Sequence, residues 1–431
     1  MKKHLIYLSL VIAIFSACEK EDDPVFDQSP DERLNETLTM YQGELTGAPY
    51  GWKAMVFPAG MPNSVFSFYM KFNGSNRVSM FSDFDAESST TLQESSYRLK
   101  ALQQPSLLFD TYSYLHVLCD PDAGVNGGAY GKGLYSDFEF ALDSISGDTI
   151  HLTGRFNKSK AYLVKATQEE AQEYMSLERN REFEHITQFL TYFKRLTVGG
   201  TQYELTVNPY AHVIGFTWVD DKGEKQQDVV GFYYTPNGIA FAPAFTDGKN
   251  TITGLQDITW DAEGQIMSFT VDDASAMISG FAKPLVVDTA APKRWWNKGQ
   301  SMEYWVSTTG FHANGVDDAF NITSLPSYYF LTFWPTYAGT SYDILIFVTV
   351  VDNTLVPSYG PAFRAPRFTA DGRIIFPYSD DRGTYPPGPA PVHNTRNQLA
   401  DAAGYYLVQV NQDQYDMVSA KDGKAWITWV R

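Results

Sequence analysis

The sequence predicts a mainly β protein, made of tandem antiparallel sheet modules of sandwich or barrel type with two supporting helices. Three observations carry this prediction. Apolar and polar residues alternate over much of the chain, as in half-buried strands. The strand-like segments are separated by turn-forming pairs such as Asn73-Gly74 and Asp371-Gly372. Helical periodicity is confined to two stretches, residues 29–46 and 167–196.

The composition is that of a folded, acidic chain. Hydrophobic residues make up 44% of the 431 residues and charged residues 19%, a balance typical of globular rather than disordered proteins. The formal net charge of −17 argues against nucleic acid as a partner and against electrostatic docking on anionic lipid. Because there are only two cysteines and Cys18 lies in a leader-like segment, stability must come from packing rather than disulfides.

The first residues have the features of an export signal. Lys2 and Lys3 precede an apolar run, 5–15, that is too short to cross a bilayer as a helix, and Ser16-Ala17-Cys18 follows. This arrangement resembles a bacterial lipoprotein signal peptide over residues 1–17. The resemblance implies cleavage before Cys18, a diacylglycerol on its sulfur and a lipid-anchored location at the outer membrane. The alternative is a plain secretory signal with an incidental cysteine.

An acidic segment, residues 18–28, follows and is expected to be a tether. Within it, Lys20, Glu21 and Asp22 resemble the lysine-plus-acidic export signal of Bacteroidetes surface lipoproteins. That resemblance implies display on the cell surface. The alternative is an ordinary acidic linker on the periplasmic face.

Residues 29–166 are predicted to be a helix plus a β-sheet domain. Ser29 can cap the helix, with Pro30 in its first position and Glu32 completing a capping box. Period-two alternation then continues to residue 165.

Residues 167–287 repeat the order of helix, then strands, as a second domain. Thr167 and Glu170 predict another capping box, and the helix is expected to extend to Leu196. Its core-facing stripe is made of Phe183, Ile186, Phe189, Leu190 and Phe193. Farther on, Thr235-Pro236-Asn237-Gly238 between two apolar runs indicates a hairpin.

The remaining residues, 288–431, are predicted to be a C-terminal β region rich in loop aromatics. Residues 288–300 are expected to be its linker to the preceding domain, because polar and small residues dominate there.

Several stretches together are similar to a Bacteroidetes surface lipoprotein family of unknown function, DUF4302. They are SPDERL at 29–34, GW at 51–52, NRVSM at 76–80, ESSYRL at 94–99, PSLLFDTY at 105–112, SDFEF at 136–140 and GVDDAF at 315–320. The resemblance implies a surface lipoprotein of the kind encoded beside outer-membrane nutrient-import systems. It brings no catalytic residues.

Catalytic and metal motifs give no positive assignment. The sequence lacks an H-E-x-x-H pair, a G-x-S-x-G elbow and an EF-hand pattern. Cys119 lies in an apolar stretch, which predicts an inert buried thiol. No catalytic residue, metal site or cofactor is therefore predicted, and enzyme activity is left open.

Aromatic residues near turn-forming residues are the remaining candidates for function. Trp295, Trp296, Trp334 and Tyr337 are predicted to form a ligand-binding face, because loop aromatics present flat apolar surfaces with polar edges. The alternative is that they plug the end of a sandwich or barrel.

The leading hypothesis is a surface-anchored lipoprotein that binds an extracellular glycan or peptide for an outer-membrane nutrient-import system. Its partners would be an outer-membrane transporter or another surface lipoprotein. Two alternatives from other classes are a secreted hydrolase with an unrecognised active site and a structural or assembly subunit of a surface lipoprotein complex.

The anchor is directly testable. Cys18→Ala is expected to abolish lipidation and release the protein from membranes, because the acyl chains on Cys18 supply the stable attachment. Incorporation of radiolabelled palmitate and membrane fractionation measure this. Unchanged labelling and fractionation of the variant would contradict the lipoprotein hypothesis.

Overall fold

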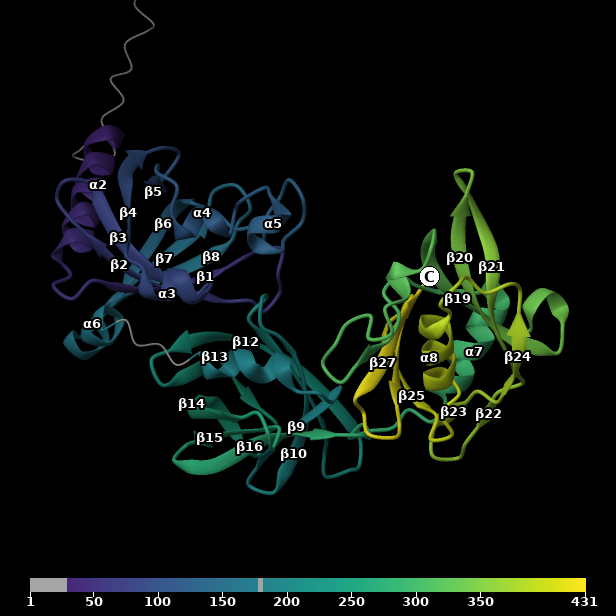
Figure 1. Ribbon diagram of the computed structural model, residues 1–431. Helices are drawn as coiled ribbons and strands as arrows, with labels where there is room; N and C mark the ends of the chain where they lie inside the picture. Colours follow the sequence, from purple (N-terminus) through teal and green to yellow (C-terminus); the bar gives the residue numbers. More distant parts are fainter. Residues whose placement is uncertain (1–28, 177–180) are drawn as a thin grey trace, which may run out of the picture. The chain divides into compact units, whose positions relative to one another are not determined.

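The protein contains three antiparallel sheets in chain order, seen in a computed structural model that describes residues 29–176 and 181–431 (Figure 1). The first two sheets are closed eight-stranded barrels, and the third is an 11-stranded sheet. The mainly β prediction is thus confirmed, and for the first two sheets the barrel replaces the sandwich. None of the helices within these described residues is long and apolar enough to cross a membrane.

Contacts between residues divide the chain into two compact units. The first comprises the described residues up to Ala54 together with Tyr69–Met80 and Leu92–Ala171. The second comprises Met55–Phe68, Phe81–Thr91 and the described residues from Gln172 to Arg431.

The first barrel is preceded by helix α2 (Pro30–Gly47), whose predicted capping box between Ser29 and Glu32 is present. A hydrogen bond joins the helix to the sheet, because Trp52 Nε1 donates to the Leu45 carbonyl at 3.0 Å. The strands are β1 (Trp52–Phe57), β2 (Phe66–Phe72), β3 (Arg77–Ser82), β4 (Gln93–Ala101), β5 (Pro105–Phe109), β6 (Glu139–Ser146), β7 (Thr149–Gly154) and β8 (Lys160–Lys165). Three short helices lie in its connections: α3 (Ala86–Thr90), α4 (Tyr114–Val117) and α5 (Ala123–Asn126).

The second barrel closes around a core rich in aromatic side chains. Phe216 and Phe245 stack there with ring centroids 4.0 Å apart. The predicted hairpin is confirmed, because Thr235 pairs with Gly238 across a two-residue turn. The strands are β9 (Phe193–Val198), β10 (Thr201–Asn208), β11 (Val213–Val219), β12 (Lys225–Thr235), β13 (Gly238–Thr246), β14 (Thr251–Asp261), β15 (Ile266–Val271) and β16 (Ala274–Phe281).

The single helix predicted over 167–196 is wrong. Its capping box exists, since the Glu170 amide donates to Thr167 Oγ1 at 3.2 Å, but α6 covers only Gln168–Met175. A 3₁₀ helix, Glu182–Gln188, follows, and β9 already begins at Phe193. The apolar stripe misled because a spacing of three to four residues also fits a 3₁₀ turn that buries its aromatic residues in the barrel core.

The C-terminal sheet packs one face on two helices, α7 (Ala291–Met302) and α8 (Ala390–Leu399). Its strands are β17 (Trp305–Ser307), β18 (His312–Ala313), β19 (Tyr328–Trp334), β20 (Tyr342–Val351), β21 (Thr354–Arg364), β22 (Arg367–Phe368), β23 (Arg373–Ile375), β24 (Tyr378–Arg382), β25 (Tyr405–Asn411), β26 (Gln414–Ser419) and β27 (Ala425–Val430). Two 3₁₀ turns, η2 (Ile322–Ser324) and η3 (Tyr337–Gly339), flank β19.

The linker predicted at residues 288–300 is also wrong, because most of it is α7. Pro292 lies in the first turn of the helix, where its missing N–H costs nothing. Gly299 lets the helix approach the sheet, since a Cβ at this position would lie 2.7 Å from the Trp305 ring. The many polar residues of this stretch belong to the helix face that does not pack on the core.

Candidate ligand-binding site

Trp295 belongs to the core. Its side chain on α7 has no exposed surface, and its ring lies 5.2 Å from that of Phe333 and 6.0 Å from that of Trp305. The prediction that Trp295 contributes to a ligand face is therefore wrong. The sequence misled because the neighbouring proline and asparagine belong to a helix and not to a loop.

Trp296 is half-buried, and its indole N–H makes a hydrogen bond with a buried carboxyl group. Its Nε1 donates to Asp343 Oδ2 at 2.8 Å, and the backbone N–H of Thr336 donates to Asp343 Oδ1 at 2.8 Å. The Asp343 carboxyl therefore connects α7 to the turn after β19. Burial raises the pKa of Asp343 to about 6, against the two hydrogen bonds that favour its ionised form.

Trp334 and Tyr337 lie together with two further tyrosines in what we call the aromatic row: Tyr304, Trp334, Tyr337 and Tyr342. Tyr304 and Trp334 stack with centroids 4.9 Å apart, Trp334 and Tyr337 are 5.1 Å apart, and Tyr337 and Tyr342 are 6.3 Å apart. The Arg382 guanidinium lies 5.0 Å from the Tyr342 ring at the end of the row. All four rings are half-buried, so each keeps some exposed surface.

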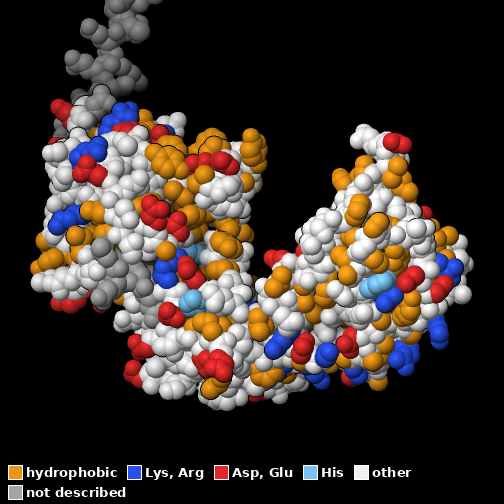
Figure 2. All heavy atoms as spheres, in the orientation of Figure 1, with side chains coloured by type: hydrophobic (Ala, Val, Ile, Leu, Met, Phe, Trp, Pro, Cys, Tyr) orange, Lys and Arg blue, Asp and Glu red, His pale blue; other side chains and the backbone are white. Residues whose placement is uncertain are grey.

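The elements of the C-terminal sheet position the row. Alternation along β20 turns Leu345 and Phe347 into the helix-covered core, while Ile344, Ile346 and Val348 face the opposite side. Trp334, Tyr337 and Tyr342 pack on these three aliphatic side chains. Hydrophobic side chains accordingly reach the surface around β20 and β21 (Figure 2).

The turn that carries Tyr337 is held in an uncommon conformation. Thr336 and Ala338, on either side of Tyr337, have φ values of 48° and 49°, in the left-handed region that residues other than glycine rarely adopt. Such strain persists only when the surroundings fix it, and it concentrates at functional sites. Here the hydrogen bond from Thr336 to the buried Asp343 carboxyl supplies the restraint.

Sequence reasoning thus found two members of the row and missed Tyr304 and Tyr342. A signal for Tyr342 was present, because it follows Gly339-Thr340-Ser341, the same kind of turn-forming neighbourhood that singled out Tyr337. Tyr304 follows the end of α7, and nothing in the sequence joins it to Trp334, 30 residues later. Half-exposed rings in a row over an apolar base are suited to stacking on flat apolar groups of a ligand.

The other predicted functional residues have separate outcomes. Cys18, Lys20, Glu21 and Asp22 lie outside the described residues. Cys119 is half-buried, and the burial of its thiol raises the pKa of that group to about 12, so the thiolate needed for nucleophilic chemistry is disfavoured at neutral pH. Across residues 29–176 and 181–431, no group of three or more His, Cys, Asp or Glu side chains could hold a metal ion.

Comparison with known proteins gives one informative match. A family model described as Domain of unknown function (DUF4302) matches residues 22–262. No curated protein matches. The aromatic row lies beyond the matched residues.

Solved structures give only distant likenesses. The DNA polymerase III subunit beta from Pseudomonas aeruginosa is 6% identical, with 92% of this chain and 97% of that chain covered and a TM-score of 0.13. Transferrin binding protein B from Neisseria meningitidis is 6% identical, with 88% of this chain and 74% of that chain covered and a TM-score of 0.14. The DNA polymerase sliding clamp from Bacillus subtilis is 7% identical, with 93% of this chain and 96% of that chain covered and a TM-score of 0.15. Scores this low carry no inference about this chain.

The buried Asp343 predicts a pH dependence. Because its pKa is raised from 3.8 to about 6 in the folded state, the protonated form is favoured by folding, and this contribution to stability is lost as the pH rises from about 4 through 6. A shift of about two units corresponds to roughly 2–3 kcal/mol. Urea unfolding at pH 4, 5, 6 and 7 should show the free-energy difference between wild type and Asp343→Asn changing by that amount. If the free energies of unfolding of the two proteins changed in parallel with pH, the effect of burial on the pKa of Asp343 would be contradicted.

Proposed function

Since the chain belongs to the family described as Domain of unknown function (DUF4302), which brings no activity with it, we propose a function from its residues. The protein is a Bacteroidetes lipoprotein that is anchored through Cys18, displayed at the cell surface and able to bind an extracellular glycan at the aromatic row. It delivers this ligand to an outer-membrane nutrient-import system.

The aromatic row is the observation that carries the proposal. The less polar face of a sugar ring stacks on aromatic rings, and tyrosine hydroxyls at the ring edges can exchange hydrogen bonds with sugar hydroxyls. Because the rings are already half-buried against Ile344 and its neighbours, little side-chain entropy is lost when a ligand settles on them.

A glycan fits this surface better than a peptide strand does. A peptide that extends a sheet needs an unpaired strand edge. The row lies over β19 and β20, and β20 is hydrogen-bonded on both sides, to β19 and to β21. Its backbone groups are therefore already used, and recognition must come from the side chains.

The N-terminal segment supports the location part of the proposal. The acidic segment 18–28 begins at Cys18, and α2 begins at Pro30. Only a short stretch of chain would therefore join α2 to the lipid on Cys18. Lys20, Glu21 and Asp22 would direct it outward, where extracellular glycans are accessible. An outer-membrane transporter or a second surface lipoprotein would then receive the ligand.

The glycan-binding proposal is tested by removing two of the half-buried rings of the row. A glycan array identifies the ligand with wild-type protein, and calorimetry compares Tyr337→Ala and Tyr337→Ala/Tyr342→Ala with wild type. Stacked rings at binding hot spots contribute about 1–3 kcal/mol each, so the single variant should bind at least about 5-fold more weakly and the double variant at least about 30-fold more weakly.

Tyr210→Ala is the matched control, because Tyr210 is 81% exposed and lies away from the row, on the β10–β11 connection. It should bind as wild type does. Failure of wild-type protein to retain any glycan, or equal affinity of the row variants and the control, would contradict the proposal. Melting temperatures of all variants establish that they are folded.

A further inference from the structure

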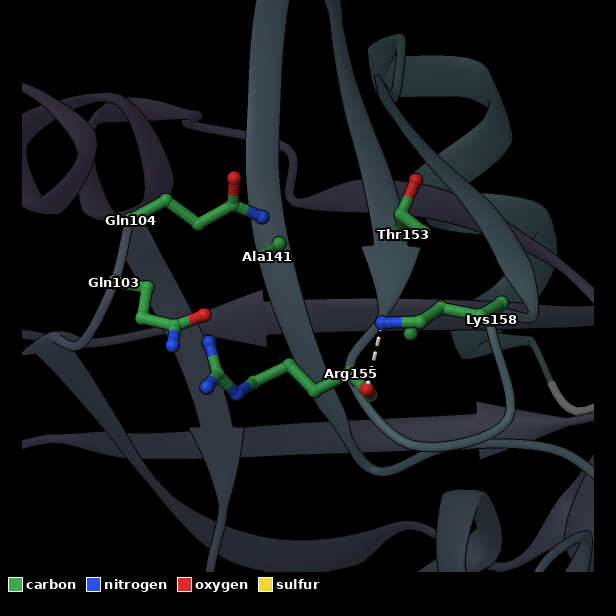
Figure 3. Close-up of a pocket in the computed structure, with 7 residues that line it drawn as sticks. Gln103, Gln104, Ala141, Thr153, Arg155 and Lys158 are labelled. Atoms are coloured by element: carbon green, nitrogen blue, oxygen red, sulfur yellow. Dashed lines mark hydrogen bonds between the residues drawn. The ribbon is translucent and has the colours of Figure 1, made fainter.

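The first compact unit carries a pocket of about 200 Å³ over strands β6 and β7 (Figure 3). Alternation along β6 turns the buried Phe140 and Leu142 to one side of the sheet and Ala141 to the other. Ala141, which pairs with Ser106 on β5 and Thr153 on β7, is one of the residues that line the pocket. Because the alanine side chain is short, the surface is hollowed between the longer side chains around it.

The turn after β7 is fixed beside this hollow by a buried carboxylate. Asp137 accepts hydrogen bonds from the backbone N–H groups of Phe156, Asn157 and Ser159 at 2.7, 2.8 and 3.1 Å, and from the Ser159 hydroxyl at 2.6 Å. Only glycine fits at position 154, since a Cβ there would lie 2.0 Å from Asp137 Oδ2. The turn therefore presents its side chains in a set geometry before any ligand arrives.

Two of those side chains are cationic and lack an acidic partner. Within the described residues, no carboxylate lies within 4 Å of the charged nitrogens of Arg155 or Lys158. Arg155 Nη1 donates to Ser106 Oγ at 3.0 Å, and Lys158 Nζ donates to the Arg155 carbonyl at 2.9 Å. In the same unit Arg77 and Arg98 each bind a carboxylate.

The rest of the lining is uncharged. Gln103 and Gln104, from the β4–β5 connection, face the cationic side of the pocket, and the Gln103 side chain points toward that of Arg155 (Figure 3). Of the neighbouring acids, Asp143 accepts a hydrogen bond from Oγ1 of the lining residue Thr153, and Asp137 holds the turn. No aspartate or glutamate is among the residues lining this pocket, although the chain has a net charge of −17.

We propose that this pocket binds an oxyanion group: the sulfate, phosphate or carboxylate of a small ligand. Arg155 and Lys158 supply positive charge, and the planar guanidinium can donate two parallel hydrogen bonds to such a group. The amides of Gln103 and Gln104 supply further donors. The proposal stands on this pocket alone and is independent of the aromatic row.

Calorimetry at low ionic strength tests it with three probes: sodium sulfate, sodium phosphate and sodium galacturonate. The full soluble chain should bind at least one of them, with an affinity that falls as NaCl is added, because exposed charges are screened. Arg155→Gln should weaken binding about tenfold or more, since a charge-assisted bidentate contact is lost. Lys158→Gln should weaken it by a smaller factor.

Lys71→Gln is the matched control, because Lys71 is an exposed lysine of the same barrel outside the pocket. It should bind as wild type does. Arg155 also bonds to Ser106, so Lys158→Gln, at an exposed position, keeps the test valid if Arg155→Gln loses stability. Binding of sulfate or phosphate alone assigns a tetrahedral oxyanion, and binding of galacturonate alone assigns a sugar carboxylate. Binding of none, or equal affinity of Lys158→Gln and Lys71→Gln, overturns the proposal.

Discussion

Closure of the first two sheets around their own side chains determines which of their surfaces are left for a ligand. An eight-stranded barrel has an interior just wide enough to be filled by side chains or to hold one small ligand. In the second barrel the filling is aromatic: Phe216 stacks on Phe245, and Phe183 of the 3₁₀ helix packs against Phe232. With the interior occupied and the strand edges paired, ligand-binding groups have to lie on outer surfaces and connections.

Both candidate binding surfaces use the same device to hold a loop in place. Asp137 accepts backbone N–H groups and fixes the turn that presents Arg155. Asp343 accepts the Thr336 N–H and the Trp296 indole and fixes the turn that presents Tyr337. A buried carboxylate is costly unless it is hydrogen-bonded, and these bonds offset part of that cost while ordering the loop. Preorganisation of this kind lowers the entropy lost when a ligand binds.

The parts of the fold that could be predicted depend on residues close in sequence. The capping box of Ser29 and Glu32 and the hairpin at Thr235–Gly238 are local, and both are present as predicted. Strand alternation also gave the mainly β class, because burial on one face of a strand has a period of two.

The parts that were missed depend on contacts between distant residues. Trp295 is a core residue only because α7 packs on the C-terminal sheet, and polar neighbours made the helix resemble a linker. Trp296 meets Asp343 47 residues later, and Arg155 meets Ser106 49 residues earlier. Neither spacing follows from periodicity, so these partly buried hydrogen bonds at the two surfaces could not be deduced from the sequence.

A crystal structure of the protein with the glycan that binds most tightly would show whether the glycan lies on the outside of a filled β scaffold, at the aromatic row. We expect a sugar ring stacked on Tyr337 or Tyr342, with the side chains inside both barrels unchanged. A glycan lodged inside a barrel, or bound at a surface that the row does not form, would contradict this expectation.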